Sequence, residues 1–288
     1  MTAEPQANQT TTLGYMRRSP AGVVLTLLTV MAAALWFFPI YWAVITSLRS
    51  DEDTVTDFGL LPADPTLKSY IFDIVHSELP IWYLNSTLTA VGVTVAVVAM
   101  SACTGYAISQ LRFPGRMLLW GTILASFMVP VTALMVNHFI IMADVGLLNT
   151  HLGIILPMLL HPVTVIVYKQ FFDGLPKEFR EAAVMDGATE LQVFTRVFLP
   201  MNWGVTTALA IITFIGAWNA FLWPFLVAQD EKMMTVTVGI AAVQDAFGVA
   251  YGRVLAGAVL GSLPVALAYL LFQRRVTQAI ALSAGIKG

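Results

Sequence analysis

Long uncharged, mainly apolar stretches alternate with short charged segments along the 288 residues of this chain. Between consecutive Asp, Glu, Lys or Arg residues, six stretches reach 20 residues or more: 19–48, 79–111, 117–143, 145–168, 197–229 and 254–273. About 20 helical residues cross roughly 30 Å of hydrocarbon. The pattern therefore predicts an all-α, polytopic membrane protein with six transmembrane helices, at about 22–47, 84–109, 117–142, 150–169, 203–227 and 253–273.

The chain divides into a polar N-terminal tail, residues 1–20, and a transmembrane domain, residues 21–288. Arg17 and Arg18 precede the first span, as they would in a signal peptide. The uncharged run at 19–48 is too long for the apolar core of a signal peptide, and residues 36–39 offer no small-residue cleavage site. We therefore expect the first span to be retained as an anchor.

Lys and Arg are distributed unequally between the two sides of the predicted membrane. Four of the 15 lie on one side: Arg49, Lys68, Lys232 and Arg253. The other eleven share the side of the N-terminus: Arg17, Arg18, Arg112, Arg116, Lys169, Lys177, Arg180, Arg196, Arg274, Arg275 and Lys287. The positive-inside rule makes that side cytoplasmic. With six crossings, both termini are then cytoplasmic.

Composition narrows the class of function. Charged residues make up 11% of the chain, against about a quarter in soluble domains, and the net charge of −2 comes with no basic stripe for nucleic acid. Cys103 is the single cysteine, and no motif for a metal site or a hydrolase is found. None of the five lysines follows a glycine, so a phosphate-binding Walker A loop is excluded. The sequence therefore predicts that this chain does not bind ATP through such a loop.

The inner segment 171–200 is the one long charged connection that reads as folded structure. Pro176 suits the start of a helix, and Glu178 in the first turn complements the helix dipole. Gly187 fits the left-handed position after the last turn, which predicts a helix over 176–186. Thr189 and Gln192 form a capping-box pattern for a second helix, which we expect Pro200 to end.

Small residues give this segment the character of a docking surface. Ala182 and Ala183 present almost no side chain, so a partner could approach the backbone closely, and Arg180 and Glu181 place charge beside them. On physical grounds alone, an amphipathic helix that merely closes a loop at the membrane surface is an equal alternative.

The segment resembles the EAA loop of ABC-importer permeases, through which a cytoplasmic ATPase drives a membrane channel. The matching residues are Glu181, Ala182, Ala183, Asp186, Gly187, Leu199 and Pro200, with Val197 where the family usually has Ile. Further resemblance covers most of the chain: Asn85 and Ser86, residues 171–172 and 175–178, the Trp-Asn-Ala-Phe-Leu-Trp-Pro run at 218–224, and residues 256–258, 263–264 and 283–288. The chain is similar to the carbohydrate-importing branch, in particular to the smaller permease of the maltose importer.

This resemblance implies a transmembrane permease subunit of the prokaryotic inner or plasma membrane. It would translocate a sugar or sugar-like solute by alternating access. Its partners would be membrane lipid, a second homologous permease, two ATP-binding subunits and an external solute-binding protein. ATP and Mg would bind the ATPase, and this chain would bind no cofactor. The residues expected to couple to the ATPase are Arg180, Glu181, Ala182, Ala183, Asp186, Gly187 and Pro200.

Four residues within predicted spans are candidates for the substrate pathway: Trp218, Asn219, His161 and Asn137. Polar groups are costly in lipid and usually face the bundle interior. The alternative is structural: Trp218 packs, Asn219 bonds across helices, and His161 satisfies a backbone acceptor freed near Pro162.

The alternative function is an ion-gradient-driven secondary transporter or channel. Such proteins normally carry an ionisable residue within the membrane. The six long stretches contain no Asp, Glu, Lys or Arg, which favours the ATP-driven importer.

Overall fold

The computed structural model describes residues 20–50, 53–56, 59–62, 64–243 and 251–283, and within these ranges every regular element is a helix. The predicted tail lies almost wholly outside the described residues. The elements in order are α2 (Pro20–Ser47), α3 (Asp53–Thr56), α4 (Lys68–His76), α5 (Leu79–Gln110), α6 (Arg116–Phe127), η1 (Val131–Leu134), α7 (Met135–Asp144), α8 (His151–Met158), α9 (Pro162–Asp173), α10 (Lys177–Met185), α11 (Glu190–Val193), η2 (Phe194–Phe198), α12 (Leu199–Met201), α13 (Trp203–Trp218), α14 (Leu222–Val227), η3 (Glu231–Met233), α15 (Val236–Ala242) and α16 (Tyr251–Ser283).

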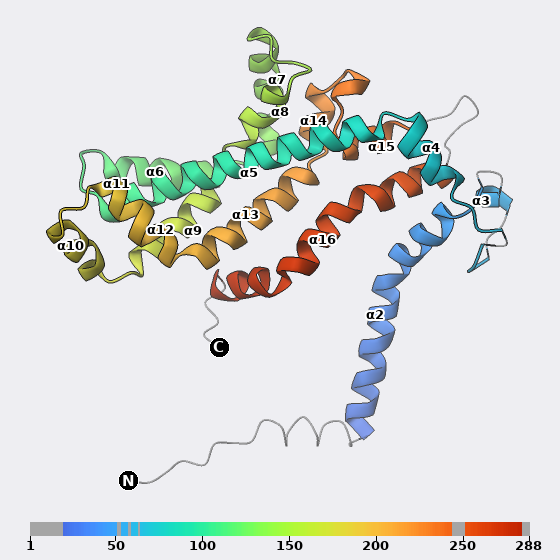
Figure 1. Cartoon of the computed structure of the whole chain (residues 1–288), viewed down its shortest axis with the longest axis horizontal. Helices are drawn as coiled ribbons and strands as arrows, with labels where there is room; N and C mark the ends of the chain where they lie inside the picture. The colour runs from blue at the N-terminus through green and yellow to red at the C-terminus, as the bar shows by residue number, and fades with distance from the viewer. Residues whose placement is uncertain (1–19, 51–52, 57–58, 63, 244–250, 284–288) are drawn as a thin grey trace.

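Three helices are long and apolar enough to cross a membrane unbroken: α2, α5 and the Tyr251–Gln273 part of α16. Of these three segments α5 is the longest, and it lies along the length of the molecule (Figure 1). It begins at Leu79, five residues before the predicted start at 84, and Pro80 near its N-terminus suits a first turn that needs no backbone N–H partner.

Three further pairs of helices are long and apolar enough to cross a membrane only when the two helices of each pair are taken together. The bend is 93° between α6 and the Val131–Asp144 segment, 50° between α8 and α9, and 80° between Glu190–Met201 and α13. Pro130 lies at the first bend and Pro162 opens α9 at the second, where the missing backbone N–H interrupts helical hydrogen bonding. The described chain thus holds three spans, or up to six if each bent pair is one span.

The predicted span 203–227 is interrupted in the structure. The helix α13 ends at Trp218 and α14 begins at Leu222. Pro224 has no backbone N–H to donate to the carbonyl of Ala220, and the hydroxyl of Thr237 donates to that oxygen instead, at 2.7 Å. A nearby proline therefore causes the break, and a residue of α15 satisfies the carbonyl that the break leaves open.

Close packing around α5 depends on a glycine. A Cβ added at Gly105 would lie 2.8 Å from the Cβ of Tyr168 and 3.0 Å from the backbone N of Lys169, both in α9. Any side chain at this position would push α5 and α9 apart. The contact brings the two helices together beside the inner segment.

Segment 228–243 is bound to the first two turns of α5. Three α5 side chains make these bonds: the Asn85 amide donates to the carbonyls of Lys232 and Met234 at 2.8 and 3.0 Å, the Trp82 indole donates to the carbonyl of Glu231 at 2.8 Å, and the Ser86 hydroxyl accepts from the N–H of Val236 at 2.8 Å. These bonds therefore attach this end of α5 to η3 and to the start of α15.

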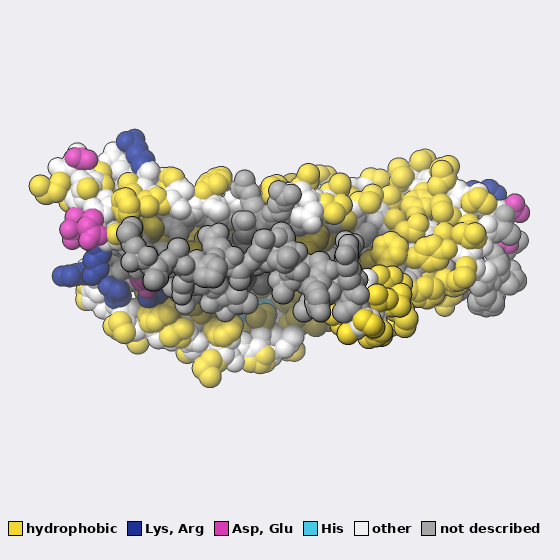
Figure 2. Space-filling model, turned by 90° about the horizontal axis from the view of Figure 1, so that it is seen from below, with side chains coloured by type: hydrophobic (Ala, Val, Ile, Leu, Met, Phe, Trp, Pro, Cys, Tyr) yellow, Lys and Arg dark blue, Asp and Glu magenta, His cyan; other side chains and the backbone are white. Residues whose placement is uncertain are grey.

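The surface of the molecule is divided by polarity. On the face shown in Figure 2, charged side chains gather near the two ends, and the described side chains visible between them are mainly hydrophobic or uncharged. The apolar window of α2 has no residue buried inside the structure, and Trp36 is 83% exposed. Exposed apolar surface on this scale requires lipid or another apolar partner, and a membrane supplies lipid.

Candidate functional site

The helix α10 lies at one end of the molecule (Figure 1). It begins after Pro176, which precedes the first helical residue, and it ends before Asp186, one residue inside the predicted 176–186 at each end. Gly187 has a φ of +83°, the left-handed conformation that its position predicted. The N–H of Gly187 bonds the carbonyl of Val184, and the N–H of Ala188 bonds the carbonyl of Ala183, both at 3.0 Å. This pair of bonds is a Schellman ending.

The second helix starts with the capping box that the sequence predicted. The N–H of Gln192 bonds the Thr189 hydroxyl at 3.4 Å, and the Gln192 side chain accepts from the N–H of Thr189 at 2.8 Å. The prediction that Pro200 ends this second helix is narrowly wrong. Pro200 lies inside α12, and the chain turns at Asn202. The preceding turn, η2, is a π-helix, whose wider hydrogen bonding accommodates a proline that cannot donate.

The two alanines of α10 differ in exposure, although the sequence placed them on one patch. Ala182 is exposed beside exposed Glu181, whereas Ala183 is partly buried and packs against the core cluster that contains Phe172 and Phe198. The outer surface of α10 also shows Met185, which is 87% exposed. The exposed surface of α10 therefore presents only one of the two alanines, Ala182, with charged and apolar neighbours.

Arg180 turns toward the protein and does not extend the outer patch. Its guanidinium pairs with the carboxylate of Glu190, which raises the pKa of Arg180 above its usual value. The second oxygen of the same carboxylate accepts a hydrogen bond from the hydroxyl of Tyr106 in α5, at 2.9 Å. We call Arg180, Glu190 and Tyr106 the inner latch. Sequence reasoning missed Glu190 and Tyr106, because 84 residues separate them and neither belongs to a local motif.

The ring of Tyr106 is held in an aromatic cluster formed by Tyr106, Tyr168, Phe172, Phe194 and Phe198. Its centroid lies 6.0 Å from Phe172, 5.1 Å from Phe194 and 5.3 Å from Phe198. Tyr106 is 4% exposed and Phe172 and Phe198 are fully buried. The cluster joins α5, α9 and η2 into one packed unit beneath α10.

A second polar contact ties α5 to α9 without reaching α10. The Ser109 hydroxyl donates to Asp173 at 2.6 Å, and Lys169 pairs with the same carboxylate. The Gln110 amide donates to the carbonyl of Phe172 at 3.0 Å. This contact lies one turn along α5 from Tyr106 and shares its chemistry, a hydroxyl bonded to a carboxylate.

The four pathway candidates are placed separately. Trp218 is 2% exposed, its indole N–H donates to the carbonyl of Gly261 at 3.0 Å, and its ring lies 5.7 Å from that of Tyr83. Its contacts are those of a packing residue. His161 is partly buried and its Nδ1 lies 2.7 Å from the Thr164 hydroxyl. Asn219 at the end of α13 and Asn137 in α7 are exposed.

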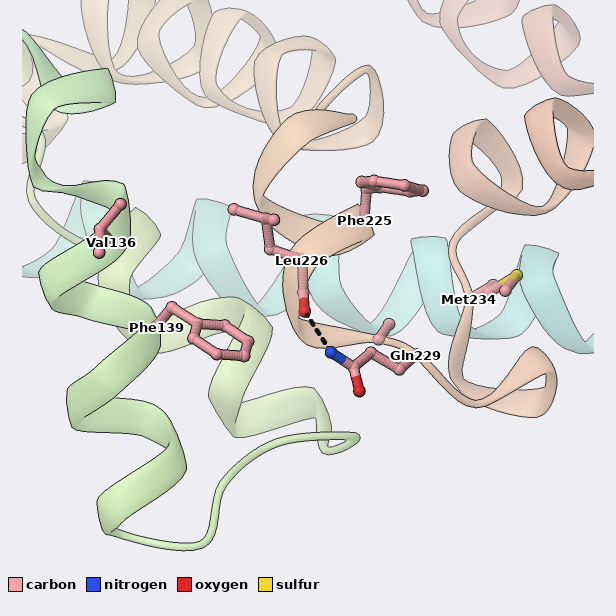
Figure 3. A pocket seen from close by; sticks show the side chains of 7 residues that line it. Val136, Phe139, Phe225, Leu226, Gln229 and Met234 are labelled. Carbon is pink, nitrogen blue, oxygen red and sulfur yellow. Dashed lines mark hydrogen bonds between the residues drawn. The ribbon is translucent and has the colours of Figure 1, made fainter.

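A cavity of about 460 Å³ lies between α7 and α14 (Figure 3). It is lined by Val136, Phe139, Phe225, Leu226, Ala228, Gln229 and Met234. Gln229 supplies the amide of this otherwise apolar lining, and that amide donates to the carbonyl of Leu226 at 3.4 Å. The four pathway candidates are not among the lining residues, although Asn137 follows Val136 directly.

Comparison with known protein families identifies the family to which this chain belongs. Residues 14–281 match the family described as "Binding-protein-dependent transport system inner membrane component", and the chain belongs to that family. It is a multi-pass permease subunit of an ATP-driven ABC importer and not a gradient-driven transporter or channel.

Curated relatives match over almost the whole chain. The chain is 31% identical to the arabinooligosaccharides transport system permease protein AraQ of Halalkalibacterium halodurans, over 95% of this chain and 100% of the relative. It is 32% identical to the lactose transport system permease protein LacG of Rhizobium radiobacter, over 91% and 95%. It is 30% identical to the sn-glycerol-3-phosphate transport system permease protein UgpE of Yersinia pestis bv. Antiqua (strain Antiqua), over 86% and 92%.

The fold is shared with a solved transporter. The structure superposes on a chain of a bacterial ABC transporter involved in the import of the acidic polysaccharide alginate, with a TM-score of 0.80. The match covers 94% of this chain and 99% of the other, at 22% sequence identity. At this identity the likeness concerns the fold.

Proposed function

We propose that α10 is the helix through which a partner ATPase drives this permease, and that the transported solute is a sugar or sugar-like compound. The observation that carries the first part is the exposed Ala182, flanked by Glu181 on a helix that a Schellman bend fixes at one end of the molecule. The second part rests on relatives named for arabinooligosaccharides and lactose.

The proposed topology has six spans and both termini in the cytoplasm. The spans are α2, α5, α6 with α7, α8 with α9, α13 with α14, and α16. Segment 171–200 is the cytoplasmic coupling loop of a permease domain at 21–288, so α13 is paired here with α14 and not with Glu190–Met201. The unequal distribution of Lys and Arg supports this orientation.

The proposed complex contains a second homologous permease, two ATP-binding subunits and an external solute-binding protein. ATP and Mg bind the ATPase subunits in this proposal, since this sequence has no Gly-Lys pair for a phosphate loop. Closure of the ATPases would pull α10 and rock the spans between inward and outward access.

For the pathway, we propose that Asn219 and Asn137 face the solute. Both carboxamides are exposed in the isolated subunit, and each offers a donor and an acceptor for hydroxyl groups. Trp218 and His161 would support the route through their bonds to Gly261 and Thr164.

Cross-linking tests the docking of α10. With Cys103→Ser as background, Ala182→Cys should cross-link to the ATPase in membranes that hold the assembled complex. Arg112→Cys, exposed on the inner turn between α5 and α6, is the matched control and should not. Cross-linking from Arg112→Cys alone would contradict the assignment of α10.

A further inference from the structure

The inner latch joins α10 to a helix that is distant in sequence. The chain itself connects the coupling segment to α9 and, through α12, to α13. Arg180, Glu190 and Tyr106 add a non-covalent connection from α10 and α11 to α5. We propose that this latch carries the movement of α10 into α5, and so to the opposite end of the molecule; the proposal rests on the coupling role of α10 proposed above.

Glu190 is the centre of the latch because its two carboxylate oxygens bind different elements. One oxygen binds Arg180 of α10, and the other accepts from Tyr106 of α5. The ion pair alone would contribute little, since the two side chains are 31% and 42% exposed and surface pairs are weak. The bond to Tyr106 differs, because its ring is buried among Phe172, Phe194 and Phe198 and its hydroxyl has little freedom to follow a displaced partner.

The helix α5 can pass this movement on over a long distance. From Tyr106 to Asn85 it rises about 1.5 Å per residue, or roughly 30 Å in all. At Asn85 and Ser86 the same helix holds segment 228–243 through side-chain bonds to its backbone. Displacement of Tyr106 along the helix axis would therefore move η3 and α15 as well.

The test uses the complete complex, reconstituted with its ATPase and binding protein. Tyr106→Phe keeps the buried ring and removes only the hydroxyl, and Glu190→Gln keeps the shape of the side chain and removes its charge. Both complexes should assemble and hydrolyse ATP at the basal rate. Stimulation by the loaded binding protein, and uptake, should fall about tenfold, which corresponds to about 1.4 kcal/mol of lost coupling.

Ser109→Ala is the matched control, because it removes a hydroxyl–carboxylate bond one turn away on α5 that does not reach α10. It should leave stimulation unchanged. The double variant Tyr106→Phe with Glu190→Gln should be no worse than either single variant if the residues act as one unit. A purely structural role would instead lower yield and basal hydrolysis together.

Two outcomes overturn the latch: normal stimulation in Tyr106→Phe, or an equal loss in Ser109→Ala. If either variant assembles poorly, the other decides the result. Cross-linking of Ala182→Cys in the same complexes separates the two proposals. If Ala182→Cys cross-links and Tyr106→Phe is stimulated normally, only the proposal of the latch is refuted. If Ala182→Cys does not cross-link, the proposed coupling role of α10 is refuted.

Discussion

At the scale of single residues, Gly187 sets the direction of the chain after α10. Its φ of +83° is forbidden to proline, whose ring fixes φ near −65°, and proline would also remove the N–H bonded to Val184. No atom lies within 4 Å of a Cβ built there, so alanine would cost only the left-handed conformation, about 1 kcal/mol. We expect Gly187→Pro to abolish uptake in a membrane-inserted protein and Gly187→Ala to reduce it. Normal uptake in Gly187→Pro, measured at equal complex yield, would reduce the segment to a linker.

The role of Trp218 in the structure follows from its position beside α16, not from its residue type. Pro264 leaves the carbonyl of Leu260 without its helical partner, and the Tyr83 hydroxyl donates to it, while the Trp218 indole donates to the next carbonyl, that of Gly261. Trp218→Ala should lower the stability of the complex by about 3 kcal/mol, while Trp218→Phe retains more of the packing. The measurement is the thermal midpoint beside uptake. Full stability with selective loss of uptake would instead favour a direct role of Trp218 in the substrate pathway.

Local patterns explain which residues of the site were predictable. Gly187 and the Thr189–Gln192 capping box depend on residues within a few positions, and the sequence identified both. Glu190 and Tyr106 were missed because only the packing of α5 against the inner segment brings them together. The burial of Ala183 likewise depends on the aromatic cluster, which no local pattern contains.

At the scale of elements, hydropathy located the apolar segments and could not locate their bends. An uncharged run gives no sign of whether a proline will kink a helix or interrupt it. The break between α13 and α14 depends on Thr237, 17 residues beyond the carbonyl it binds. Bends in the other pairs similarly need the packed arrangement to define their angles.

The break between α13 and α14 gives a direct prediction. Thr237→Val leaves the part-buried carbonyl of Ala220 without its hydroxyl donor, at a cost of about 1 kcal/mol, the lower end of the range for an unsatisfied acceptor. Thr237→Ser keeps the hydroxyl. We expect the valine variant of the purified complex to unfold at a lower temperature than the serine variant. Equal midpoints would show that the break does not depend on this bond.

At the scale of the whole molecule, the distribution of charge predicts how the chain lies in the membrane. A reporter fused after residue 288 should report the cytoplasm, and one inserted near Asp64 should report the exterior, because eleven of the 15 Lys and Arg residues lie on the proposed inner side. Activity of the periplasmic and cytoplasmic reporters at each site is the measurement. The reverse pattern at both sites would place α10 outside, away from any ATPase.

In the proposed mechanism, a partner ATPase drives this permease through the exposed face of α10. Uptake by reconstituted complexes carrying Ala182→Trp tests it most directly, with Leu191→Trp as the control, since Leu191 is 70% exposed on α11 and outside α10. A bulky side chain at Ala182 would hold the ATPase surface away from the backbone. We expect Ala182→Trp to insert normally and to lose uptake, whereas Leu191→Trp should transport. Uptake at the normal rate in Ala182→Trp would contradict this mechanism.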